Sequence, residues 1–154
     1  MKFAGRIDVP APRAAVFKKL RDARFFASCV DGVEELSEID DRHYTATLAT
    51  KVAYLSFRFA VSVEITELDE PVRVVAKVEG TPLGMVGRLT ATSAADLVEQ
   101  DGGTAVNYEL DVALAGKLGS LGQPVLKSKA KEMERQFAAR IRAHFQTEAL
   151  GRDA

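Results

Sequence analysis

The sequence predicts an α+β domain in which helices cover one face of an antiparallel sheet. Apolar residues alternate with polar ones over most of residues 33–114, which is the period of strands with one buried face. From roughly residue 118 to 147 the period changes to three or four, as in a long amphipathic helix. Strands that follow one another without helices between them favour an antiparallel sheet with the helices packed on one side.

The N-terminal part predicts one strand and two short helices. Residues 2–9 alternate between apolar and charged or small side chains, as a half-buried strand does. Pro10 and Pro12 end this strand, and Pro12 suits the first turn of a helix that runs to Asp22. A second short helix is expected over about 22–28.

Six consecutive strands are expected after the Asp31-Gly32 turn signal. They cover about 33–39, 44–48, 55–65, 71–80, 85–98 and 104–114. The clearest is 55–65, in which apolar side chains occupy every second position. Segments 80–84 and 101–103 are predicted as turns because glycine and proline favour them.

Length and composition indicate one ordinary globular domain, which we place at residues 1–150 with a short tail at 151–154. The net charge of −1 and the lack of a basic cluster interleaved with aromatics argue against nucleic-acid binding. No Cys/His spacing indicates a metal site, and we expect no cofactor. The sequence has neither a signal-peptide core nor a membrane-length apolar run, so we expect a cytoplasmic protein.

The sequence also offers no catalytic constellation, and we expect a protein that is not an enzyme. His43 lies beside a predicted turn and His144 near the end of the long helix, so both are interpreted as surface or helix-edge residues. Cys29 lies near Asp31, whose carboxylate would raise the pKa of the thiol, and is interpreted as a small buried side chain. No serine-nucleophile, phosphate-loop or dinucleotide motif is present.

Several local stretches carry a family resemblance in addition to the order of elements. These are Pro10-Ala11-Pro12 with the short helix after it, residues 29–36, strand 54–66, the Glu79-Gly80 pair and residues 116–122. Together they resemble the CoxG family of carbon monoxide dehydrogenase, and the element order resembles the helix-grip layout of the START-like (SRPBCC) superfamily. Three residues depart from the family pattern: Asp31 replaces a common proline, Val33 a second cysteine and Ala53 a hairpin glycine.

The resemblance implies a helix-grip fold: a curved antiparallel sheet of about seven strands wrapped around the long C-terminal helix. It implies accessory rather than catalytic work, in association with a carbon monoxide dehydrogenase or a related molybdenum hydroxylase. It also implies membrane recruitment and the carriage of a lipophilic molecule, lipid- or quinone-like, between helix and sheet.

We therefore expect an apolar small-molecule ligand in the space between helix and sheet. The expected ligand-binding residues are Tyr44, Leu48, Phe57, Phe59, Val61, Leu83, Met85, Leu89, Tyr108, Met133, Phe137 and Ile141. Small residues on the same face would leave room unless they are filled from the opposite side: Ala46, Gly87, Ala91 and Ser93. Access is expected between residues 30–33, 80–84 and 116–122, whose glycines permit movement.

Two alternatives stay open at this stage. A cyclase- or hydrolase-type enzyme of the same superfamily should place at least two convergent polar groups in the cavity, whereas a pure interaction module should have a filled core. Charge is also uneven: eight basic and four acidic residues occur from Gly116 onward, giving +4 against −5 for residues 1–115. The basic face of the last helix is therefore either a solvated surface or a site of peripheral contact with anionic lipid or an acidic partner.

Overall fold

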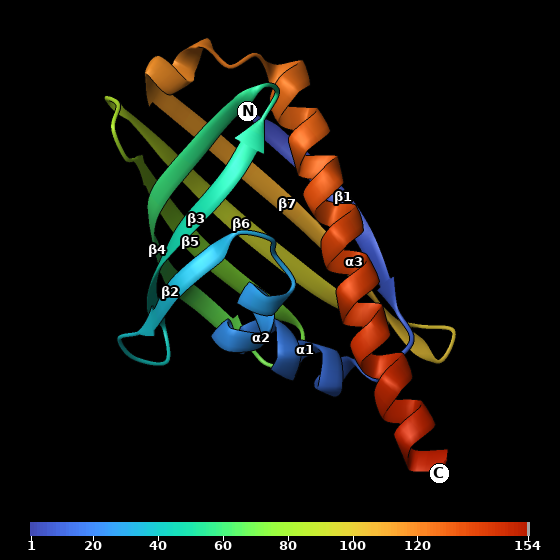
Figure 1. The fold of residues 1–154 in the computed structure, drawn as a ribbon. Helices are drawn as coiled ribbons and strands as arrows, with labels where there is room; N and C mark the ends of the chain where they lie inside the picture. The colour runs from blue at the N-terminus through green and yellow to red at the C-terminus, as the bar shows by residue number, and fades with distance from the viewer. Residues whose placement is uncertain (154) are drawn as a thin grey trace.

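Seven strands form one antiparallel sheet in the order β1-β7-β6-β5-β4-β3-β2. The computed structural model describes the backbone of residues 1–153 and the side chains of residues 1–147. The strands are β1 (Lys2–Val9), β2 (Val33–Glu38), β3 (His43–Val52), β4 (Leu55–Asp69), β5 (Arg73–Pro82), β6 (Gly87–Gln100) and β7 (Gly103–Gly116). Figure 1 shows the sheet curving around one long helix. The predicted α+β helix-grip architecture is confirmed.

The register explains the curvature and the single buried face. Every strand alternates, and the pairings bring apolar residues of neighbouring strands into rows on one face, for example Ala91 of β6 between Val78 of β5 and Val112 of β7. A bulge between Ile65 and Glu67 bends β4. The side of the sheet that faces the long helix is called the concave face below.

Two short helices follow β1: α1 (Arg13–Arg21) and α2 (Ala23–Ser28). Asp22 separates them, and its carboxylate caps α2 by accepting hydrogen bonds from the amides of Arg24 at 3.0 Å and Phe25 at 3.1 Å. The long helix α3 (Gln123–Asp153) lies against the concave face, close to β1 and β3. Within the described residues, no helix is long and apolar enough to cross a membrane.

The structure differs from the sequence prediction at two element boundaries. The helix expected from about residue 118 is divided into a short 3-10 helix, η1 (Lys117–Ser120), and α3. Gly119 and Gly122 weaken helix propensity there, and Pro124 fits only in a first turn. Residues 80–82, predicted as part of a turn, still pair with β4. At the C-terminus α3 continues through residues 151–153, and Ala154 lies outside the described residues.

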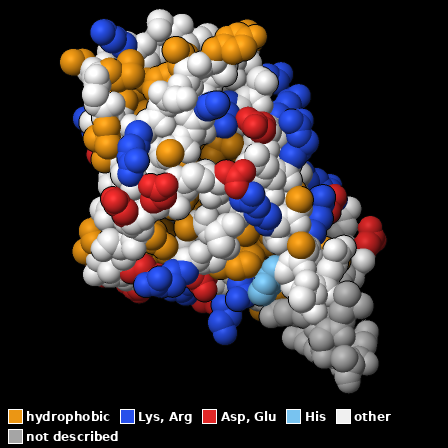
Figure 2. All heavy atoms as spheres, in the orientation of Figure 1, with side chains coloured by type: hydrophobic (Ala, Val, Ile, Leu, Met, Phe, Trp, Pro, Cys, Tyr) orange, Lys and Arg blue, Asp and Glu red, His pale blue; other side chains and the backbone are white. Residues whose placement is uncertain are grey.

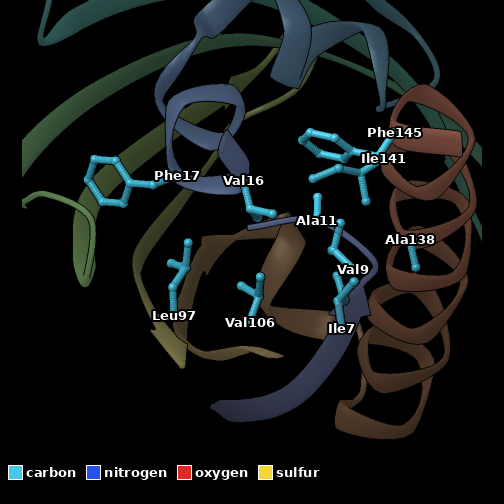
Figure 3. Close-up of a cluster of buried hydrophobic side chains, with 10 residues drawn as sticks. All are labelled: Ile7, Val9, Ala11, Val16, Phe17, Leu97, Val106, Ala138, Ile141 and Phe145. Carbon is cyan, nitrogen blue, oxygen red and sulfur yellow. The ribbon is translucent and has the colours of Figure 1, made fainter. Parts of the chain in front are cut away.

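The closed hydrophobic core sits at one end of the concave face, where α1 and the C-terminal half of α3 meet β1, β6 and β7 (Figure 3). Its buried members are Ile7, Val9, Ala11, Val16, Phe17, Leu97, Val106, Ala138, Ile141 and Phe145. The buried Thr104 hydroxyl donates to the Ala11 carbonyl at 2.8 Å, which ties β7 to the segment before α1. This core anchors one end of α3 to the sheet.

A smaller buried group closes the other end of the sheet. Leu118 of η1 is 1% exposed, and a Cβ placed on Gly87 would lie 3.1 Å from Leu118 Cγ and 3.3 Å from Pro82 Cγ. Phe59 is also buried there. The concave face is therefore sealed by side chains at both ends, and the question of function concerns the region between them.

Candidate functional site

The middle of the concave face is apolar but only partly buried. Side chains there keep some solvent exposure although they lie on interior strands and face α3: Ala46, Val61, Val63, Ala76, Val78, Ala91, Ser93, Leu110 and Val112. In a filled core such side chains would be buried, as Leu97 and Val106 are at the end of the sheet. Figure 2 shows hydrophobic side chains in the recesses beside α3. The space between α3 and mid-sheet is incompletely filled by the chain itself.

Small residues account for this unfilled region, although not all of those predicted contribute. Ala46, Ala91 and Ser93 lie in the partly exposed middle. Gly87 does not, because Leu118 and Pro82 cover it from the opposite side. A Cβ on Gly80 would meet Phe59 Cδ1 at 3.5 Å, an ordinary contact, so this glycine leaves little room.

The helix contributes a mixed wall to the same space. Met133 and Phe137 are partly buried, and the Phe137 ring packs on Phe26 of α2 with centroids 4.8 Å apart. Ile141, predicted to contact ligand, is 0% exposed and belongs to the closed core. The available helix surface therefore lies on the N-terminal side of Ile141.

One polar pair joins α3 to the sheet across this region. The Tyr108 hydroxyl of β7 donates a hydrogen bond of 2.5 Å to Glu134 Oε1 of α3, and both residues are partly buried. Gly5 lies opposite Tyr108 on β1, and a Cβ at Gly5 would collide with both the hydroxyl and the carboxylate. The glycine is required here for the space that it leaves rather than for its backbone dihedral angles.

The pair has a defined hydrogen-bonding character. Burial, followed by the hydrogen bond and the charge of Glu134, raises the pKa of Tyr108 far above its usual range. The phenol therefore stays protonated and directs its only proton at Glu134, while a carboxylate accepts hydrogen bonds only. Toward a third molecule the pair offers acceptors and no donor.

The other predicted contact residues fall into two groups. Phe57 and Phe59 stack at 5.7 Å near the sealed end, beside Leu89 and across from Leu48. Met85 and Leu83 lie in or next to the β5–β6 turn, where Leu83 is about half exposed. These residues border the unfilled region from its β5–β6 end.

Tyr44 lies at the opposite rim. Its hydroxyl donates to the Asp41 carbonyl at 2.7 Å, and it lines an open surface hollow of about 420 Å³ together with Arg21 and Glu38. Burial is the main cause that raises the pKa of Tyr44. Its hydroxyl is therefore held by the β2–β3 turn, away from the Tyr108 pair.

Two of the three segments predicted to frame access are tied down. Asp31 forms a salt bridge with Arg140 of α3, and the Gly32 carbonyl accepts from the Ala49 amide at 2.9 Å. Gly116 adopts a φ of 66°, which leads the chain into η1 and buries Leu118. The β5–β6 turn instead carries exposed apolar side chains.

The residues considered for catalysis do not converge. His43 contacts Asp40 at 2.8 Å and Glu64 at 3.2 Å on the outside of the sheet, and these hydrogen bonds raise the pKa of its imidazole. His144 packs against the rings of Phe25 and Phe145, and burial raises the pKa of the Cys29 thiol. Among the described residues, no group of three or more His, Cys, Asp or Glu side chains could hold a metal ion.

Sequence reasoning missed Glu134. It lies three residues before Phe137 and seven before Ile141, which places a carboxylate on the apolar stripe of α3. A charged residue at an apolar position of a helix, together with a glycine on the apolar face of an adjacent strand, was the available signal. Phe26 was also missed as a site residue, because the contact that brings it to Phe137 is tertiary.

Similar solved structures share the fold. A conserved protein from Geobacillus kaustophilus is 24% identical, with 96% of each chain covered and a TM-score of 0.86. Protein Ms6760 from Mycobacterium smegmatis is 19% identical over 96% of this chain and 92% of that one, with a TM-score of 0.70. Ara h 8.0201 is 15% identical over 96% and 98%, also with a TM-score of 0.70. At these identities the likeness concerns the fold alone.

Sequence comparison identifies the family. Among curated proteins, no sequence matches the chain significantly. The family model for CoxG, described as a carbon monoxide dehydrogenase subunit, matches residues 5–146. This range includes every strand except the first residues of β1, and nearly all of the long helix. The chain therefore belongs to the CoxG family of carbon monoxide dehydrogenase subunits.

Proposed function

We propose that the protein binds a lipophilic small molecule, lipid- or quinone-like, between α3 and the concave face, and that it works as a carrier rather than as an enzyme. The observation that carries this proposal is the partly exposed apolar middle of the sheet, flanked by sealed ends. Filling such a space with an apolar guest removes the remaining apolar surface from water, which is favourable at about 25 cal/mol per Å².

The Tyr108–Glu134 pair sets the polar end of the ligand in this proposal. Because the pair presents acceptors only, it matches a guest that carries a hydroxyl donor, such as a hydroquinone or a long-chain alcohol. It disfavours a fatty acid, whose carboxylate would meet Glu134 in a region of low dielectric. A quinone carbonyl lacks a donor and is less well matched than its reduced form.

Titration with matched probes tests the binding proposal. We expect saturable one-to-one binding of a hydroquinone with an apolar tail, weaker binding of the corresponding quinone and the weakest binding of a fatty acid of equal length. Native mass spectrometry of gently purified protein should retain a lipophilic guest. Absence of saturable binding by folded protein for all three probes contradicts the carrier proposal.

The physiological partner in this proposal is a carbon monoxide dehydrogenase or a related molybdenum hydroxylase in the cytoplasm. The family name supports this assignment. Mixing the purified protein with such an enzyme and measuring co-elution, or electron delivery to a quinone in the presence and absence of the protein, tests the accessory role. Equal activity and separate elution would contradict it.

One observation favours a second candidate, a cyclase- or hydrolase-type enzyme. Tyr108 and Glu134 are two convergent polar groups at the unfilled region, which is what that alternative required. Against it, the Tyr108 proton is already directed at Glu134, so no donor of the pair can stabilise a developing oxyanion. Turnover of long-chain esters or of a polyketide analogue that disappears in Glu134→Gln would establish the enzyme instead of the carrier.

A further inference from the structure

Exposed apolar side chains gather at one end of the sheet. Tyr54 and Leu55 lie at the β3–β4 turn, Leu83 and Val86 at the β5–β6 turn, and each is more than half exposed. We call these four residues the sheet tip. Figure 1 shows both turns at the end of the molecule where η1 lies, away from α1 and α2.

Backbone hydrogen bonds hold the two turns in place. The Leu83 amide donates to the Arg58 carbonyl at 2.7 Å, which ties the β5–β6 turn to β4. The Lys117 amide donates to the Val86 carbonyl at 3.1 Å, which ties the other side of the turn to η1. The exposed side chains are therefore presented by anchored turns, and their exposure follows from the fold.

Charge distinguishes this end from the other one. Residues 43–63, 80–95 and 112–131, which contain both turns and η1, include no Asp or Glu. Lys51 and Lys117 are exposed next to the turns. At the opposite end, the β2–β3, β4–β5 and β6–β7 turns and their flanks carry seven acidic residues: Glu38, Asp40, Asp41, Asp69, Glu70, Glu99 and Asp101.

The basic residues of α3 are less available for a partner. Arg140 binds Asp31, Arg142 donates to the Asp8 carbonyl at 2.7 Å, and Lys129 lies 3.2 Å from Glu132. The contact predicted for the outer face of α3 therefore has fewer available charges than its sequence indicates. The sheet tip combines apolar side chains with basic ones that have no acidic neighbours in sequence.

We propose that the sheet tip is a docking surface for an anionic lipid bilayer. Tyr and apolar side chains on protruding turns suit the membrane–water interface, and lysines beside them attract anionic headgroups. A flat protein partner would contact separate protruding turns less completely than a deformable lipid surface does. This docking does not depend on the proposed ligand, and it concerns a surface outside the concave face.

A single tryptophan reports on the docking directly, because the chain contains none of its own. In Tyr54→Trp, fluorescence should shift to shorter wavelength and be quenched by brominated lipid when phosphatidylcholine/phosphatidylglycerol vesicles are added. Ile39→Trp, at a similarly exposed position of the acidic end, is the matched control and should not respond. A response of Ile39→Trp with none from Tyr54→Trp overturns the proposal.

Vesicle sedimentation with the full chain tests the energetics of the same surface. Tyr54→Asp/Val86→Asp should lower partitioning onto anionic vesicles at least tenfold, whereas Ile39→Asp/Val98→Asp should leave it unchanged. Lys51→Glu/Lys117→Glu should weaken binding to anionic vesicles and remove its salt dependence. Circular dichroism and thermal unfolding verify that the variants are folded.

Two results would contradict lipid docking while leaving ligand binding intact. Undiminished vesicle binding by the folded Tyr54→Asp/Val86→Asp variant places the contact elsewhere. No vesicle binding by the original protein, together with a concentration-dependent dimer or a dehydrogenase complex that this variant abolishes, makes the tip a protein interface.

Discussion

Tyr108 of β7 and Glu134 of α3 are joined by a 2.5 Å hydrogen bond that crosses from the sheet to the helix over the side-chain-free Gly5. This contact ties the middle of α3 to the sheet where apolar packing is incomplete. It supplies a polar acceptor in an otherwise apolar wall. Its two groups are therefore expected to influence both stability and ligand choice.

Alkaline unfolding should report the Tyr108 environment. The pKa of Tyr108 is raised in the folded state, so its contribution to stability is fully present below the unfolded pKa of about 10 and is lost as pH rises above that value. Denaturant unfolding should accordingly show a stability decline above about pH 10 that is shallower in Tyr108→Phe. Identical slopes for the two proteins would contradict a strongly raised pKa.

Gly5→Ala should break the pair sterically. Its methyl group would occupy the position of the hydroxyl and the carboxylate, so we expect a loss of about 1–3 kcal/mol of unfolding free energy. In Tyr108→Phe the added methyl meets one group fewer, and the double variant should lose less than the sum of the single variants. Strict additivity would show that Gly5 and Tyr108 do not share this contact.

Phe137→Ala distinguishes a wall residue from a core residue. Phe137 is partly buried and contacts the exposed Phe26, so truncation should cost less than half of the about 3–5 kcal/mol expected for Phe17→Ala in the closed core. Ligand affinity should fall in Phe137→Ala and collapse in Phe137→Asp, because an unpaired carboxylate would face an apolar guest. Core-sized destabilisation with unchanged ligand binding would remove Phe137 from the site.

The β3–β4 turn offers a stabilising change. Ala53 adopts a φ of 56°, a left-handed conformation that L-residues with a Cβ disfavour, and the residue is exposed. Ala53→Gly should therefore raise the unfolding free energy by up to about 1 kcal/mol while leaving vesicle and ligand binding unchanged. A lower thermal midpoint for this variant would show that the strain is absent.

The periodicity of the sequence was sufficient to predict the sheet and the long helix, because the alternation in β4 and β7 and the stripe of α3 follow directly from one-sided burial. It could not show that Leu118 covers Gly87, or that Ile141 is closed in while Ala91 is not. Those facts depend on how helix and sheet meet. The Tyr108–Glu134 pair depends on the same geometry, since its members are 26 residues apart.

Filling the unoccupied middle of the concave face tests the central claim most directly. Ala91 lies there between Val78 and Val112, and Thr92 beside it faces outward and is exposed, so Ala91→Leu and Thr92→Leu form a matched pair. A titration with the tailed hydroquinone should show at least tenfold weaker binding for Ala91→Leu and no change for Thr92→Leu, with the unfolding free energy of both within about 1 kcal/mol of the original. Overpacking of Ala91→Leu by about 1–3 kcal/mol with unchanged ligand binding would show instead that the space is closed core.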